Sequence, residues 1–160
     1  MSKMLNFNIR YVDDLVPRLQ RFKGNCYDVT AEGISVNGVP CYDTVTEYKA
    51  GDVLFIKFGF AIDMTDTVTG IKYVGDVKPR SSTFKNYGLI LTNSVGMIDN
   101  EYNGDDDIWC GMFYAVKDGS ITIHDRIAQI EFRKEAEHVL FTSVDTLNNN
   151  SRGGYGSTGK

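Results

Sequence analysis

Several features that would assign this sequence to a particular class of protein are scarce. The 160 residues contain only three cysteines, and Cys26, Cys41 and Cys110 do not form the C-x-x-C spacing of a metal site. No apolar run approaches the ~20 residues that span a bilayer, and the N-terminus lacks the pattern of a signal peptide. We therefore expect a cytoplasmic protein with reduced thiols and no membrane partner.

An excess of basic charge is also missing. The chain has 17 Lys and Arg residues against 21 Asp and Glu residues, which gives a net charge of -4. A chain with this balance is not expected to coat nucleic acid or an anionic membrane. A polyanionic ligand would have to be bound by a few well-placed cations instead.

Helical periodicity is scarce, whereas apolar and polar residues alternate in many short runs separated by turns. The sequence therefore predicts an all-β, jelly-roll-like barrel. The one expected helical turn is STFKNYG, which Ser81 or Ser82 could cap and Gly88 could end. Asn-Gly at 37–38 predicts a turn, the run GISVNGVPCYDTVTEY could form an extra hairpin, and Asp-Gly at 118–119 predicts a tight hairpin between FYAVK and SITI.

The composition changes only near the C-terminus. We expect residues 1–147 to form one β-barrel domain and residues 148–160 to form a flexible glycine-rich arm. GGYGSTGK resembles the start of a phosphate loop, but no Ser or Thr follows Lys160 and no helix can follow. Glycines beside Arg152 and Tyr155 suit a segment that closes over a bound nucleotide.

Two further stretches carry groups with chemical potential. In VKPRSSTFK, the Arg80 guanidinium precedes two hydroxyls and the free N–H groups of a helical turn, which is a phosphate-binding arrangement. The alternative is a helix cap beside a surface arginine. Asp99 follows the apolar run VGMI, so its carboxylate is expected to be either paired or functional.

The order YDVTA, PRSS, NSVGMIDNEY, RIAQI and RGGYGSTG resembles the five motifs of the homotrimeric dUTP pyrophosphatases (dUTPases). This resemblance implies a β-barrel whose three subunits share each active site, with dUTP hydrolysed to dUMP and pyrophosphate in the presence of Mg²⁺. Asp28 would hold the Mg²⁺ through water, while the triphosphate is its direct ligand. Arg80, Ser81 and Ser82 would bind phosphate oxygens, and Gln129 would contact the phosphates or their water shell.

The resemblance also assigns roles to residues in the other motifs. Asp99 would orient the attacking water, and Tyr102 would pack against the deoxyribose. The hairpin residues that would read the uracil edge are Asn93, Gly96, Met97 and Ile98. The arm residues that would close the site, with Tyr155 over the base, are Arg152, Gly154, Tyr155, Gly156, Ser157 and Thr158.

The sequence departs from the family pattern at several positions. Asn25-Cys26 replaces Ala-Gly in the first motif, Asn103 stands where Arg is common, Asp105 replaces a usual Glu, and His124 replaces a common Gly. None of these changes removes a group that the reaction requires. Two alternatives remain: a dCTP deaminase or bifunctional deaminase-dUTPase of the same fold, and a non-catalytic β-barrel trimer that binds a nucleotide or a protein.

Overall fold

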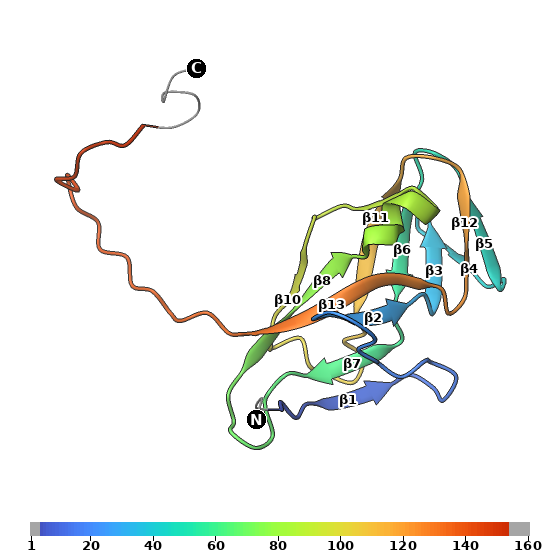
Figure 1. Ribbon diagram of the computed structural model, residues 1–160, viewed down its shortest axis with the longest axis horizontal. Coiled ribbons are helices and arrows are strands. Elements are labelled where there is room, and N and C mark those ends of the chain that lie inside the picture. The colour runs from blue at the N-terminus through green and yellow to red at the C-terminus, as the bar shows by residue number, and fades with distance from the viewer. Residues whose placement is uncertain (1–3, 154–160) are drawn as a thin grey trace.

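The computed structural model describes residues 4–153, and the regular structure in them is almost entirely β-strand (Figure 1). This confirms the all-β prediction. The elements are β1 (Asn8–Tyr11), β2 (Tyr27–Thr30), β3 (Gly33–Val36), β4 (Val39–Cys41), β5 (Val45–Tyr48), β6 (Val53–Lys57), β7 (Phe60–Asp63), β8 (Tyr73–Pro79), the helical turn η1 (Thr83–Tyr87), β9 (Leu89–Leu91), β10 (Gly96–Ile98), β11 (Cys110–Ala115), β12 (Gly119–Thr122) and β13 (Arg126–Lys134).

The strands form two larger sheets and two strand pairs. One sheet has the order β10-β8-β13-β2, the other has the order β4-β3-β6-β11-β9, and the pairs are β1-β7 and β12-β5. Val77 and Ile130 from the first sheet and Ile56 and Phe113 from the second share one fully buried core with Trp109. The arrangement is the expected jelly-roll-like fold, although the described strands do not close into one continuous barrel.

Gly75 makes a close approach possible at the centre of this core. A Cβ on Gly75 would lie 2.1 Å from the Cη2 atom of Trp109, so only glycine lets the indole ring cover β8. The same residue pairs with Ile98 at the end of β10. The indole therefore packs under the point where β8 holds the β10 hairpin.

The turn predictions had different outcomes. Asn37 and Gly38 adopt φ values of 50° and 82° and join β3 to β4, which confirms the extra hairpin. The hairpin predicted at 118–119 is wrong, because β11 pairs with β6 and β9 while β12 pairs with β5. The Asp118 carboxylate accepts a hydrogen bond from the backbone N–H of Ala50 (2.9 Å), which directs this turn to a distant part of the chain.

The predicted helical turn is present as η1. Gly88 ends it in the left-handed conformation (φ 62°), as expected. Ser82 occupies the N-cap position, but its side chain makes no capping hydrogen bond, so the predicted serine cap is wrong.

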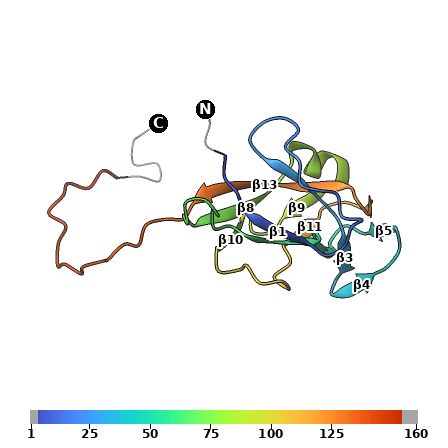
Figure 2. The same ribbon diagram turned by 90° about the horizontal axis from the view of Figure 1, so that it is seen from below.

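The sheets end before the C-terminal boundary that the composition suggested. After β13 ends at Lys134, residues 135–153 contain no strand or helix and lead away from the sheets (Figures 1 and 2). The side chains of Leu140 and Phe141 are 91% and 88% exposed there. The division at residue 147 stays a prediction. Within residues 4–153, no helix is long and apolar enough to cross a membrane.

Candidate active site

A cluster of charged side chains lies where β2, β8 and β13 meet. Asp28 on β2 accepts hydrogen bonds from two arginines, with Arg80 Nε 3.0 Å from Oδ1 and Arg126 Nη1 3.1 Å from Oδ2. The Asp28 and Arg80 side chains are 16% and 21% exposed. One carboxylate between two guanidiniums leaves a net positive charge at this end of the sheet.

The local backbone explains how Arg80 is held. Thr83 is fully buried; its hydroxyl accepts a hydrogen bond from the Arg80 N–H and donates one to the Ile127 carbonyl, each at 2.9 Å. Arg80 Nη1 also donates to Ser82 Oγ (3.2 Å), whereas Ser81 is exposed. The Thr83 hydroxyl therefore fastens the turn after Pro79 to β13.

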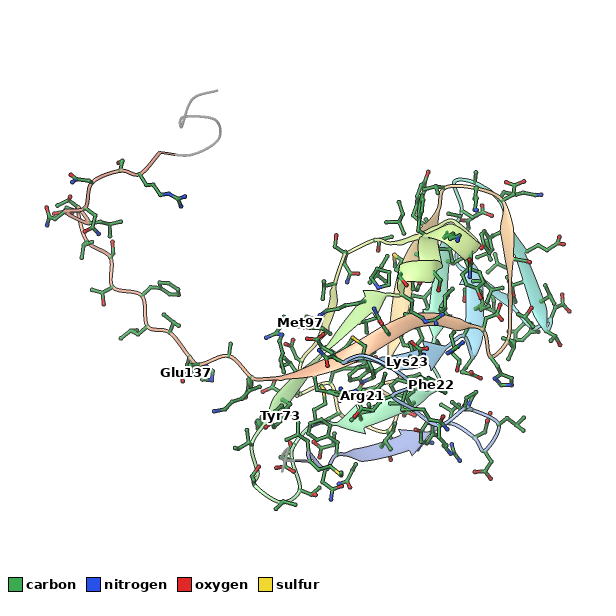
Figure 3. All side chains as sticks on the ribbon, in the orientation of Figure 1. Arg21, Phe22, Lys23, Tyr73, Met97 and Glu137 are labelled. Atoms are coloured by element: carbon green, nitrogen blue, oxygen red, sulfur yellow. The ribbon has the colours of Figure 1, made fainter. Side chains whose placement is uncertain are left out.

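Gln129 belongs to the same cluster. It pairs with Asp28 across β13 and β2, and its side-chain amide donates to the Pro79 carbonyl at 3.0 Å. A cavity of about 390 Å³ opens beside Asp28 and Arg126. The Arg126 guanidinium lies 5.2 Å from the centre of the Phe22 ring, which Figure 3 labels close to β2. We call Asp28, Arg80, Ser82, Arg126 and Gln129 the cationic cluster.

The second group of predicted residues lies on β10 and the turns on either side of it. Asn93 sits over Gly96, because a Cβ on Gly96 would lie 3.5 Å from the Asn93 amide nitrogen. Met97 is 56% exposed and lies on the outer face, where its sulfur accepts a hydrogen bond from Arg133 Nη2 (Figure 3). Ile98 ends β10 and is partly buried.

Asp99 and Tyr102 follow this strand. Asp99 is exposed, and its carboxylate makes no hydrogen bond or ion pair with any residue from 4 to 153. The Tyr102 N–H donates to the Asp99 carbonyl (3.1 Å), and the Tyr102 hydroxyl donates to the Ile108 carbonyl (3.3 Å). Burial raises the pKa of Tyr102, which keeps this hydroxyl protonated. Residues 93–102 were predicted as a hairpin, but β10 pairs with β8 and β9 pairs with β11, so they form a turn followed by an edge strand. We nevertheless call residues 93–102 the acidic hairpin.

One chain does not bring the two groups together. Ile98 pairs with Gly75 near the start of β8, whereas Arg80 directly follows the end of β8. The five residue-to-residue steps from Gly75 to Arg80 span about 16 Å of extended chain. Asp99, which lies beyond Ile98, is therefore remote from Arg80 of its own chain.

The C-terminal segment is a third separate part. Arg152 is exposed at the end of the stretch that leads away from the body (Figure 1). The predicted arm residues Gly154, Tyr155, Gly156, Ser157 and Thr158 lie outside the described residues.

Comparison with known proteins agrees with this set of parts. A family model described as dUTPase matches residues 42–159. The SPbeta prophage-derived deoxyuridine 5'-triphosphate nucleotidohydrolase YosS of Bacillus subtilis is 34% identical over 157 residues, covering 97% of this chain and 99% of the relative. This chain belongs to the dUTPase family.

Other dUTPases extend the comparison. The deoxyuridine 5'-triphosphate nucleotidohydrolase of Rickettsia typhi is 31% identical over 147 residues, covering 90% of this chain and 95% of that protein. The fold is similar to a Staphylococcus bacteriophage 80alpha dUTPase mutant with dUpNHpp (TM-score 0.69, 16% identity, 97% and 99% coverage). It is also similar to the dUTPase of Streptococcus mutans (TM-score 0.59, 22% identity, 86% and 98% coverage).

Arg126 is the member of this dUTPase's cationic cluster that sequence reasoning missed. Arg126 is the first residue of the RIAQI run, but the resemblance assigned a role only to Gln129 in that run. Its importance follows from the 3.1 Å contact with Asp28, which only the pairing of β13 with β2 creates.

The donor set around Asp28 fits a magnesium ion held through water. No group of three or more His, Cys, Asp or Glu residues that could hold a metal occurs in the described part of the chain. Both Asp28 oxygens already accept hydrogen bonds from arginine. Mg²⁺ keeps several waters and is commonly bound by one carboxylate together with substrate phosphates, so Asp28 fits an outer position.

Proposed function

We propose that this chain hydrolyses dUTP to dUMP and pyrophosphate. The observation that carries the proposal is the cationic cluster, in which Arg80 and Arg126 share Asp28 beside an open cavity in a member of the dUTPase family. The named relatives act on deoxyuridine 5'-triphosphate. Their substrate supplies the negative charge that this cluster can neutralise.

The cationic cluster would bind the triphosphate. Arg80 donates to phosphate oxygens once it exchanges part of its contact with Asp28, and Ser81 and Ser82 add hydroxyl donors beside it. Gln129 contacts the phosphates or their water shell. When bound, Mg²⁺ neutralises charge on the triphosphate, with Asp28 on its water shell.

The acidic hairpin would bind the nucleoside and supply the reacting water. Asn93 and the backbone of residues 96–98 read the uracil edge, while Tyr102 packs against the deoxyribose. Asp99 accepts a proton from a water and aligns it for in-line attack at the α-phosphorus, after which the bond to the pyrophosphate oxygen breaks. The carboxylate of Asp99 is exposed and has no partner within residues 4–153, which supports this role.

We further propose that a homotrimer completes the site. The separation of about 16 Å between the strand ends supports a site in which Asp99 of one chain acts with Arg80 of another. The exposed Leu140 and Phe141 support a C-terminal segment that packs on a neighbouring subunit. That segment brings Arg152, Gly154, Tyr155, Gly156, Ser157 and Thr158 to close a site made by other chains. A cytoplasmic location also stays a prediction.

The test is incubation with each deoxynucleoside triphosphate and Mg²⁺, with release of pyrophosphate and of ammonia measured in parallel. We expect pyrophosphate from dUTP and little from the other nucleotides, since a site that pairs with uracil leaves polar groups unsatisfied with cytosine. Ammonia released from dCTP would identify a deaminase. Binding of dUTP without release of either product would identify a non-catalytic module.

A further inference from the structure

His124 occupies an unusual position next to the cationic cluster. Its backbone has φ 74°, a left-handed conformation that favours glycine, and glycine is the residue that the family pattern commonly shows here. Its side chain is 47% exposed. It lines the same 390 Å³ cavity as Asp28 and Arg126. A side chain that disfavours this backbone conformation therefore stands beside the proposed phosphate-binding groups.

The His124 ring is fixed from one side. Nδ1 lies 3.0 Å from Oε2 of Glu32, whose side chain is only 7% exposed, and the Thr30 hydroxyl also donates to Glu32. Nε2 has no partner among residues 4–153. The charged form of an imidazole donates from both nitrogens, so a ring that gives one N–H to Glu32 has the other available for an anion.

The charges around His124 favour an anion in the first cavity. Arg126 and Arg18, which also pairs with Asp14, line it together with Asp28, and Asp28 is already engaged by two arginines. On its other side, His124 borders a second cavity, of about 690 Å³, whose charged lining residues are Glu32, Asp43 and Lys57. The excess of positive charge therefore lies on the side that holds Asp28 and Arg126.

We propose that His124 is a further substrate-binding residue, whose imidazolium, oriented by Glu32, binds the terminal phosphate of the triphosphate. This inference rests on the proposed function for the position of the substrate. The α-phosphate lies at Arg80 and the acidic hairpin, and the chain of phosphates extends into the cavity shared by Arg126 and His124. His124 then acts on groups that leave as pyrophosphate and contributes nothing to binding of dUMP.

The test compares His124→Gly with the wild type at pH 6.5. Glycine suits the positive φ, which offsets part of the lost contact with Glu32, so the variant is expected to fold. We expect inhibition by pyrophosphate to weaken about tenfold, as for loss of one charged hydrogen bond, with inhibition by dUMP unchanged. An unchanged inhibition constant for pyrophosphate, or equal weakening for dUMP, would overturn the proposal.

A matched pair of variants separates charge from shape. His124→Asn tolerates the left-handed backbone but carries no charge, so it should match His124→Gly. Glu32→Gln leaves the ring in place without the orienting charge and should give a smaller loss for pyrophosphate alone. Calorimetric titration with Mg²⁺ and inorganic tripolyphosphate tests His124 without turnover. If the wild type failed to hydrolyse dUTP, the proposed function would fail, whereas equal tripolyphosphate binding by wild type and His124→Gly would refute only the role of His124.

Discussion

The cationic cluster and the acidic hairpin hold their charges in opposite ways. Asp28 and Arg80 are mostly buried, and each makes hydrogen bonds that reach neighbouring strands. Asp99 and Met97 on the hairpin are exposed, and the Asp99 carboxylate has no partner among the described residues. The first region is held together by contacts within the chain, whereas the second presents its carboxylate at the surface.

The two regions differ in this way because one holds two like charges close together and the other holds a single carboxylate. Two guanidiniums repel each other, so they need the carboxylate of Asp28 and a fastened backbone before the substrate arrives. A single carboxylate that orients water must instead remain free to accept a proton. The fold provides the first condition by pairing β2, β13 and β8, and it provides the second by placing Asp99 just beyond the edge strand β10.

The largest expected effect is at Asp99. Asp99→Asn removes the proton acceptor from the reacting water and keeps the size of the side chain, so kcat should fall about 1000-fold. Affinity for a non-hydrolysable dUTP analogue should stay within a few-fold of the wild type, because the carboxylate is not a binding group. Stopped assays of pyrophosphate release with calorimetry on the analogue measure both quantities. Full turnover in this variant would remove Asp99 from the mechanism.

Mixing two inactive variants tests whether the two regions act in different chains. Asp99→Asn and Arg80→Ala are each expected to be inactive alone. If each site combines the hairpin of one chain with the cationic cluster of another, co-expressed 1:1 mixtures should recover about a quarter of wild-type activity by random assembly. The matched control is the wild type co-expressed 1:1 with the double variant Asp99→Asn/Arg80→Ala, because it contains the same number of each substituted side chain. No recovery in the mixture would place both groups in one chain's site.

Removal of residues 152–160 tests the contribution of the C-terminal segment while leaving the cationic cluster and the acidic hairpin intact. The body ends at Lys134 and makes its core without this segment, so the truncated protein should fold and keep its oligomeric state. Loss of Arg152 and of site closure should slow dUTP hydrolysis about 100-fold. Light scattering, melting temperature and kcat are the measurements. Unfolding of the truncated protein would show that the segment belongs to the core.

The strands and several residues of both regions could be predicted from the sequence. The alternation of apolar residues predicted the strands, and the motif order predicted Asp28, Arg80 and Asp99 as functional residues. The sequence could not give their distances, because these depend on the pairing of β10 with β8 and of β13 with β2.

The incorrect predictions share one physical cause. Asp-Gly at 118–119 is a local hairpin signal, but Asp118 bonds to Ala50 across the molecule. Ser82 is a local capping signal, but its hydroxyl accepts a hydrogen bond from Arg80, whose guanidinium is held by Asp28 on the distant strand β2. In both places a long-range hydrogen bond overrides a short-range preference, and no window of neighbouring residues contains that information.

The smallest expected effect concerns the support beneath the cationic cluster. The Tyr48 hydroxyl donates to the Tyr87 carbonyl at 2.7 Å, which ties η1 to β5. Tyr48→Phe should lower the free energy of unfolding by about 1 kcal/mol at pH 7. Burial raises the pKa of Tyr48 to about 12, so the wild type loses this contribution as pH rises from about 10, where the unfolded tyrosine ionises, through 12. Urea unfolding should show that the difference in the free energy of unfolding between the two proteins is smaller at pH 11 than at pH 7.

Two outcomes of this experiment are informative. A larger difference in the free energy of unfolding at pH 11 would contradict the assignment to the Tyr48 hydroxyl. A KM for dUTP that rises with Tyr48→Phe would mean that η1 positions the phosphate donors.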